Sequence, residues 1–198
     1  MIKVVSFTIL FFFTLIGNMP LKANEETSET TVSFSSDSYL KINGKTNVSK
    51  FNCSFNIQAF SNEIKIGYKE LENSIQFNSA TIQLPNIEFH CGGKAINKDF
   101  RKLLRTDEYP KITLSLKEIS KQNETSEFIN ATLSITICNI SKDYKIPVKI
   151  IKGNEIYVQG LLPINITDFN LEAPKKMLGM VKVSPEIEIE FALKINEV

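Results

Sequence analysis

The chain has 198 residues, 42% of them apolar, and its 23 basic and 22 acidic residues nearly cancel. This length suits one domain with a sizeable core, and the lack of a basic surplus argues against a nucleic-acid partner. The single histidine, His90, excludes a multi-histidine metal site and a histidine-based triad. His90 and Cys91 would point to opposite faces of a strand. We therefore expect no catalytic residue, no metal and no cofactor.

The N-terminus predicts export. Lys3 precedes an apolar run over residues 4–16, and Leu21 and Ala23 fit the −3 and −1 positions of a cleavage site. The run has about 13 residues, fewer than the roughly 20 that a membrane-spanning helix needs. We interpret residues 1–23 as a signal peptide, with an uncleaved anchor as the alternative, and residues 24–37 as a flexible leader. Residues 38–198 form one domain, periplasmic or secreted, without a membrane span in the mature chain.

Most of the domain alternates apolar and polar residues, the pattern of strands with one buried face. The phase changes near Ser79, which indicates a bulge. The segments give about eight strands if two of them form one bent strand: 39–46, 48–60, 74–84, 86–91, 111–119, 127–138, 143–151, 154–168 and 185–196. Parallel sheets buried on both faces do not show this pattern. An antiparallel barrel and a β-sandwich both remain open on the pattern alone.

The same alternation selects the side chains that face the interior. Ala59 and Gly160 share the inward parity with a larger apolar set: Phe51, Phe55, Ile57, Phe77, Phe89, Leu114, Leu133, Ile135, Val158, Leu162, Ile164, Ile189 and Phe191. An eight-stranded barrel is wide enough to be filled by side chains or to hold one slim ligand. On the residues alone, this set forms either a dry core or the lining of a ligand cavity.

Two of the three cysteines share the inward parity. Cys53 and Cys91 are therefore expected to form a disulfide, which exported proteins favour. The bridge would close a loop worth roughly 4 kcal/mol in the chain-entropy model. Cys138 has the polar parity of its strand and is left over. The pairings 53–138 and 91–138 each join an inward to an outward position, so we rank them lower.

One helix is predicted, over residues 97–105 in "NKDFRKLLRT". Asn97 is positioned to cap it, and Phe100, Leu103 and Leu104 form an apolar stripe. Pro110 then forces Tyr109 into an extended conformation. We interpret the helix as an element that plugs or flanks the sheet.

Four stretches together resemble the YceI family of secreted lipid-binding proteins. "INKDFRKLLRTDEYPKITLSL" is similar to the family's helix, Tyr-Pro turn and strand, and "INGKTNVSKFNCSF" to the opening strands of its Bacteroidetes-type branch. "ATLSITICNISKDYKIPVKI" and "LLPINITDFNLEAPKKMLGMVKVSPEIEIEFAL" resemble its later strands. The resemblance covers residues 38–196. It departs from the family at Cys138 and Asn139, where a small residue and glycine are usual.

The resemblance implies an all-β, antiparallel, eight-stranded, lipocalin-like barrel that binds an apolar, lipid-like ligand inside. The ligand would be an isoprenoid or fatty-acyl chain, held by the inward residues given above. The alternative is a filled barrel that acts through a protein partner on its outer surface. The sequence leaves the oligomeric state open.

Overall fold

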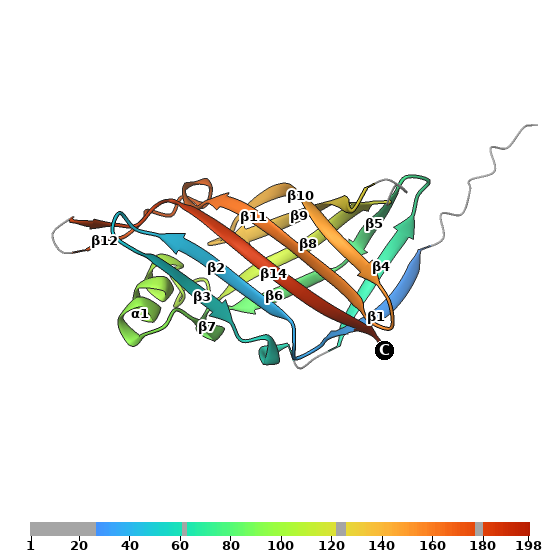
Figure 1. Cartoon of the computed structure of the whole chain (residues 1–198), viewed down its shortest axis with the longest axis horizontal. Coiled ribbons are helices and arrows are strands. Elements are labelled where there is room, and N and C mark those ends of the chain that lie inside the picture. Colours follow the sequence, from blue (N-terminus) through green and yellow to red (C-terminus); the bar gives the residue numbers. More distant parts are fainter. Residues whose placement is uncertain (1–26, 61–62, 122–125, 177–179) are drawn as a thin grey trace, which may run out of the picture.

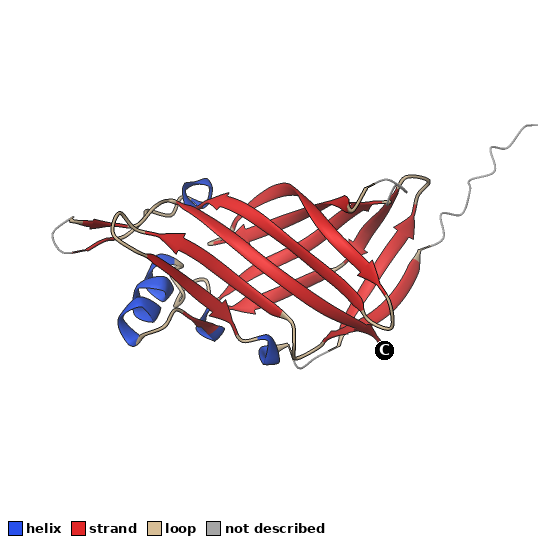
Figure 2. Cartoon of the chain, viewed as in Figure 1, coloured by secondary structure: helices blue, strands red, loops and turns tan. Residues whose placement is uncertain are grey.

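The computed structural model describes residues 27–60, 63–121, 126–176 and 180–198. The described part of the chain is antiparallel β-structure with one α-helix, α1 (Lys94–Leu103), at one end (Figures 1 and 2). The strands are β1 (Ser28–Phe34), β2 (Tyr39–Lys45), β3 (Lys50–Phe55), β4 (Ile64–Glu70), β5 (Ser74–Ser79), β6 (Thr81–Pro85), β7 (Phe89–His90), β8 (Lys111–Ser120), β9 (Phe128–Ile137), β10 (Ile140–Lys152), β11 (Ile156–Asn165), β12 (Lys175–Lys176), β13 (Val181–Lys182) and β14 (Glu186–Glu197). Three short 3-10 helices are η1 (Ile57–Ala59), η2 (Asn86–Glu88) and η3 (Ile166–Phe169).

Eight strands close into a ring in the order β1-β4-β5-β8-β9-β10-β11-β14, with β14 pairing back to β1. The ring closes because β14 has partners on both edges: β11 on one, and β1 and β2 in succession on the other. Figure 1 shows the C-terminal end of β14 beside β1. The antiparallel eight-stranded barrel expected from the sequence is confirmed.

Several strands of the barrel are interrupted rather than continuous. β1 and β2 follow one another along β14, and β5 and β6 follow one another along β8. The second interruption lies at Ala80, whose carbonyl accepts the N–H of Leu116 at 2.9 Å. The bulge predicted near Ser79 is confirmed by the register shift between the pairs Gly67–Ser79 and Tyr68–Phe77 of β4 and β5. A similar break, at η1, separates β3 from β4.

The flexible leader predicted for residues 24–37 does not extend over residues 28–34, which form β1. The segment Thr30, Thr31 and Val32 is β-branched and therefore suits an extended backbone. Val32 is buried and pairs with Ile64 of β4 and with Glu197 of β14. β1 thus belongs to the ring.

At the α1 end the sheet is open on one side. Within the described residues, no hydrogen-bonded ladder joins β6 to β3 or β7, and the chain crosses between them through η2. Asn86 in η2 is buried, and its side-chain amide donates to the Tyr109 carbonyl at 2.7 Å. Arg101 of α1 donates to the Ile87 carbonyl at 3.3 Å. The helix and the Tyr-Pro turn are therefore both anchored to the connection that spans the opening.

Helix α1 begins earlier than the sequence predicts. Gly93 is its N-cap, and Asn97 lies inside the helix, where its side-chain Oδ1 accepts the N–H of Cys91 at 2.6 Å. The capping role expected for Asn97 is wrong. The expected apolar stripe does face the barrel: the Phe100 ring lies 5.2 Å from that of Phe89, and Leu104 is buried.

The predicted bridge between Cys53 and Cys91 is confirmed, and Cys138 is free. The surface position expected for Cys138 is wrong, because its side chain is only 5% exposed. Cys138 and Asn139 both have positive φ, 48° and 64°, as a two-residue type I′ hairpin turn requires. The turn breaks the strand alternation and directs the Cys138 thiol to the Leu104 carbonyl, at 3.2 Å.

This burial predicts the behaviour of the thiols. Without reductant, the native protein should react with a thiol reagent only slowly, because Cys138 is shielded by Leu104. In denaturant, one thiol per chain should react at once. A colorimetric thiol assay under both conditions measures this, and rapid labelling of the native protein would contradict the burial of Cys138.

Candidate functional site

A cavity of about 410 Å³ lies inside the barrel at the α1 end. Six of the inward residues predicted from the sequence line it: Phe51, Phe89, Leu114, Ile135, Ile164 and Ile189. The same strands and their neighbours add residues that the sequence analysis did not select, among them Leu40, Ile42, Leu84 and Ile112. The walls are therefore almost wholly aliphatic and aromatic.

The other seven predicted residues do not line the cavity. Phe55, Ile57 and Leu162 are buried in the core, and Leu133, Val158 and Phe191 are half-buried against it. Phe77 is half-buried near Tyr68, with 6.4 Å between the ring centres. Strand parity selects the inward face correctly for many residues, but it does not show where along the barrel the interior is empty.

Helix α1 forms one wall of the cavity, which the sequence analysis missed. Ala95, Ile96, Phe100 and Leu103 all line it, together with Asp99. The helix occupies this position because the sheet is open between β6 and the β3–β7 pair. The apolar stripe was the available signal, but a stripe that seals a core and a stripe that lines a cavity have the same sequence pattern.

The mouth of the cavity lies between α1 and residues 174 and 181–184. Pro174, Val181 and Val183 line it from the side opposite α1. On the α1 side, Ala95 lines the cavity and is exposed to solvent. Besides the bridged Cys53, the polar residues of the lining are Thr46, Asp99 and Ser184, and all three are half-buried. Polar groups are thus confined to the half-exposed part of the lining.

The cavity ends part-way along the barrel. On five strands the last inward residue that lines the cavity is followed along the strand by an inward residue that does not line it. With the lining residue given first, these pairs are Ile189 and Phe191 on β14, Ile164 and Leu162 on β11, Leu114 and Leu116 on β8, Ile135 and Leu133 on β9, and Cys53 and Phe55 on β3. These second residues form what we call the floor: Phe55, Leu116, Leu133, Leu162 and Phe191.

Phe191 extends across the floor because of a glycine. It pairs with Gly160 of β11, and a Cβ atom at position 160 would lie 2.7 Å from the Phe191 Cζ atom. The ring therefore occupies the space that a side chain at position 160 would need. Gly160 is inward, as the sequence predicts, but a larger residue there would displace the floor. Ala59, expected to be inward, is exposed, because η1 interrupts the alternation.

Aromatic rings pack on the side of the floor away from the mouth. The Phe55 and Phe60 ring centres are 5.0 Å apart, and those of Phe34 and Phe60 are 5.3 Å apart. Phe55 also contacts Phe89 of the cavity wall, edge-on at 5.0 Å. Ring pairs at these distances are favourable contacts. They support Phe55 in the floor from below.

The described groups with shifted pKa values lie outside the cavity lining. Asn43 and Tyr39 donate hydrogen bonds to the Glu190 carboxylate and lower its pKa. Burial, with the charge of Asp168, raises the pKa of Tyr144 to about 12. No group of three or more metal-ligating side chains occurs within the described ranges. What the cavity can do chemically is exclude water from an apolar molecule.

Among the helices that the structure describes, none is both long and apolar enough to cross a membrane.

The chain was compared with known proteins. The search of curated proteins found no match. The crystal structure of BcnA from Burkholderia cenocepacia is similar, with a TM-score of 0.59 at 20% identity over 80% of this chain and 95% of that one. A polyisoprenoid-binding domain from Saccharophagus degradans, implicated in plant cell wall breakdown, gives 0.60 at 13% identity over 85% and 99%. At these identities the likeness concerns the fold.

The sequence itself matches a family model. The model of the YceI-like domain covers residues 24–195, which include α1 and the strands of the ring except for the last two residues of β14. The family resemblance found in the sequence is thereby confirmed, while the Bacteroidetes-type branch stays a prediction. The protein belongs to the family of YceI-like domains.

Proposed function

We propose that this protein is a non-enzymatic carrier that holds one apolar chain, fatty-acyl or isoprenoid, in the cavity beside α1. The observation that carries the proposal is a void of about 410 Å³ whose polar lining residues are half-exposed. The family membership and the polyisoprenoid-binding domain among the similar structures support it. A filled barrel that acts through its outer surface is the alternative, and the void weighs against it.

The size of the cavity limits the ligand. A methylene group has a volume similar to that of a water molecule, which occupies roughly 30 Å³ in the liquid. The cavity therefore suits a chain on the order of a dozen carbon atoms. At about 0.8 kcal/mol for each buried methylene, the gross gain is on the order of 10 kcal/mol, which the cost of ordering the chain reduces. Binding of this kind needs no charged anchor, so we expect it to tolerate salt and different head groups.

The first prediction tests the site with a fluorescent fatty-acyl probe. In the double variant Leu114→Phe and Ile189→Phe, two half-buried wall residues gain rings that enter the cavity. Probe affinity should fall at least tenfold, because both rings enter the space that the chain would otherwise fill. Titration measures the affinity, and circular dichroism checks the fold.

Two controls match these changes on the outer surface. Leu161→Phe adds a ring at a side chain that is 51% exposed, and Glu188→Gln changes an exposed residue next to Ile189. Neither should alter probe affinity. If the folded wall variant binds the probe as tightly as the controls do, the ligand is not in the cavity, and the outer-surface alternative takes its place.

The second prediction concerns the floor. Phe191→Ala removes the ring that lies over Gly160, so the cavity should extend into the rest of the barrel. A series of fatty acids of increasing length should then show a longer optimum, with up to about fourfold tighter binding for each further methylene buried. The variant should lose less than the roughly 3–5 kcal/mol typical of a fully buried phenylalanine, because Phe191 is half-buried.

The matched control is Phe77→Ala. This ring is also half-buried but does not line the cavity or its floor. The control should lose stability without changing the preferred chain length. The same length optimum in Phe191→Ala and in the unmodified protein would show that Phe191 does not limit the ligand.

We further propose that the protein is exported, and that processing follows Ala23. The apolar run near the N-terminus motivates this, and the Cys53–Cys91 bridge is of the kind that oxidising compartments favour. Cleavage there would leave β1, which begins at Ser28, intact. N-terminal sequencing of protein from the native host should begin at or near Asn24. A sequence beginning at Met1 would contradict processing.

A further inference from the structure

Two hairpins meet at the α1 end of the barrel and form one protruding unit. The turn between β2 and β3 contains Asn47, whose side-chain amide donates to the Met180 carbonyl at 2.9 Å. The Asn47 side-chain oxygen accepts the N–H of Lys182 at 2.9 Å, and the Asn47 N–H reaches the Lys182 carbonyl at 3.1 Å. Thr46 and Val183 form a β-bridge beside them. We call residues 46–50 and 180–183 the tip; β2, β3 and β12 converge there in Figure 1.

The tip exposes two large apolar side chains. Val48 is 70% exposed and Met180 is 64% exposed, more than any other described large apolar residue except the C-terminal Val198. Single exposed apolar residues are common and need no explanation. Here two of them lie on one unit that is fixed by three hydrogen bonds through Asn47. Neither side chain contributes to the core of the barrel.

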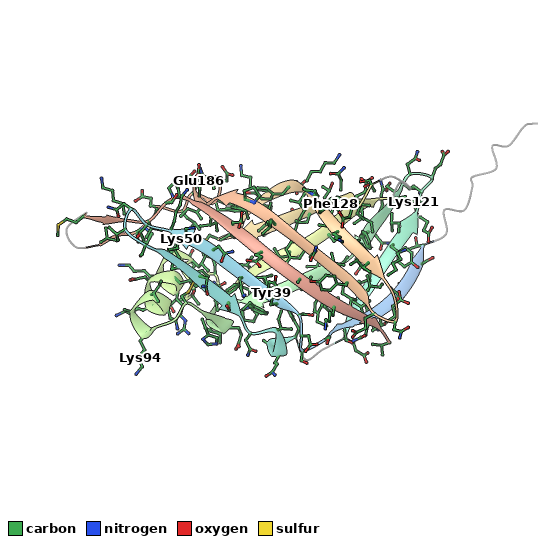
Figure 3. All side chains as sticks on the ribbon, in the orientation of Figure 1. Tyr39, Lys50, Lys94, Lys121, Phe128 and Glu186 are labelled. Carbon is green, nitrogen blue, oxygen red and sulfur yellow. A yellow bond between two sulfur atoms is a disulfide. The ribbon has the colours of Figure 1, made fainter. Side chains whose placement is uncertain are left out.

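Lysines lie on the strands of the tip and on helix α1 at the same end of the barrel. Lys45, Lys50 and Lys182 belong to the tip strands, and the exposed positions of α1 add Lys94, Lys98 and Lys102. Arg101 and Arg105 add to these cations, and the carboxylates at this end are Asp99, Asp107, Glu108, Glu172 and Glu186. Glu186 lies 3.8 Å from Lys45, with both side chains mostly exposed. The whole chain is nearly neutral, so this end carries a local surplus of positive charge. Figure 3 shows Lys50 and Lys94 at this end.

The tip also adjoins the mouth of the cavity. Thr46, Val181 and Val183 belong to the tip and line the cavity, and Ala95 of α1 faces them across the mouth. A partner surface that contacts Val48 and Met180 would therefore lie at the mouth of the cavity.

We propose that the tip docks on an anionic lipid membrane. Val48 and Met180 enter the boundary between head groups and acyl chains, while the lysines contact the phosphates. Peripheral binding of this kind adds buried apolar area to attraction for anionic lipids. Two small apolar contacts at an end that carries several lysines suit a fluid, anionic surface. Docked in this way, the cavity receives or releases its chain at the membrane, a role that goes beyond holding the ligand.

The experiment measures vesicle binding by co-sedimentation. The mature protein is mixed with vesicles of phosphatidylcholine alone, or of phosphatidylcholine with phosphatidylglycerol. It should bind the anionic vesicles more tightly, and added salt should weaken that binding, because exposed charges are screened. The tip variant combines Val48→Ser with Lys50→Gln. Loss of the lysine alone should weaken binding about fivefold, the equivalent of about 1 kcal/mol per basic residue near a membrane, and loss of Val48 should weaken it further.

The matched control makes the same kinds of change at the opposite end. Phe128→Ser removes an apolar side chain that is 51% exposed, and Lys121→Gln removes one exposed lysine. Figure 3 places both residues far from Lys50 and Lys94. The control should bind anionic vesicles like the unmodified protein.

Two results would overturn the proposal: equal binding of neutral and anionic vesicles, or equal loss of binding in the tip variant and the control. Absence of vesicle binding would also overturn it and would assign the tip to a protein partner instead. Vesicle binding does not require a ligand in the cavity. A failure here therefore remains distinct from a failure of the fatty-acyl probe to bind.

Discussion

The opening between β6 and the β3–β7 pair is the constraint on which the functional end of this molecule depends. A closed antiparallel ring needs no helix, because each strand satisfies its backbone on two neighbours. Here the ring is complete at one end and interrupted at the other, where η2 carries the chain across without a ladder. Helix α1, the Cys53–Cys91 bridge and the buried Asn86 all lie at this interruption. Where the sheet is open, these elements and their side chains close the interior of the barrel.

The interior is divided as a result. Beyond the floor, the Phe60 ring packs against Phe34 and against Phe55 of the floor. On the other side of the floor, the wall of the cavity includes helix α1 as well as strands. An eight-stranded barrel can be filled by side chains or can hold one small ligand, and here the packed part and the cavity lie on opposite sides of the floor.

Much of this structure could be predicted from the sequence, and the failures have physical causes. Alternation predicts the inward faces of the long strands, and it correctly paired Cys53 with Cys91. It missed β4, in which Gly67 interrupts a short apolar series. It misplaced Cys138, because the backbone leaves the strand conformation at the turn. A hairpin turn and a 3-10 helix each interrupt the alternation of side chains. The direction of a side chain before such an interruption therefore does not predict the direction of a side chain after it.

Only part of the candidate site could be predicted from the alternation of residues. Parity identified wall residues such as Leu114 and Ile189, because these lie in uninterrupted strands. The floor depends on the pairing of Phe191 with Gly160, which are 31 residues apart in sequence and become neighbours only through the register of β11 and β14. The contribution of α1 depends on the opening in the sheet, which no local pattern encodes. Properties of single strands were predictable, whereas properties of their packing were not.

The position of β14 at the C-terminus has a consequence for how the protein is made. Phe34 and Ile195 are ladder partners, so the first and last strands of the ring must meet before it can close. Contacts of such long sequence separation make folding slow. A chain synthesised from its N-terminus exposes the apolar faces of seven strands until the eighth is released. During that interval the exposed apolar faces and the unpaired strand edges are the features that make a partly folded chain prone to aggregate.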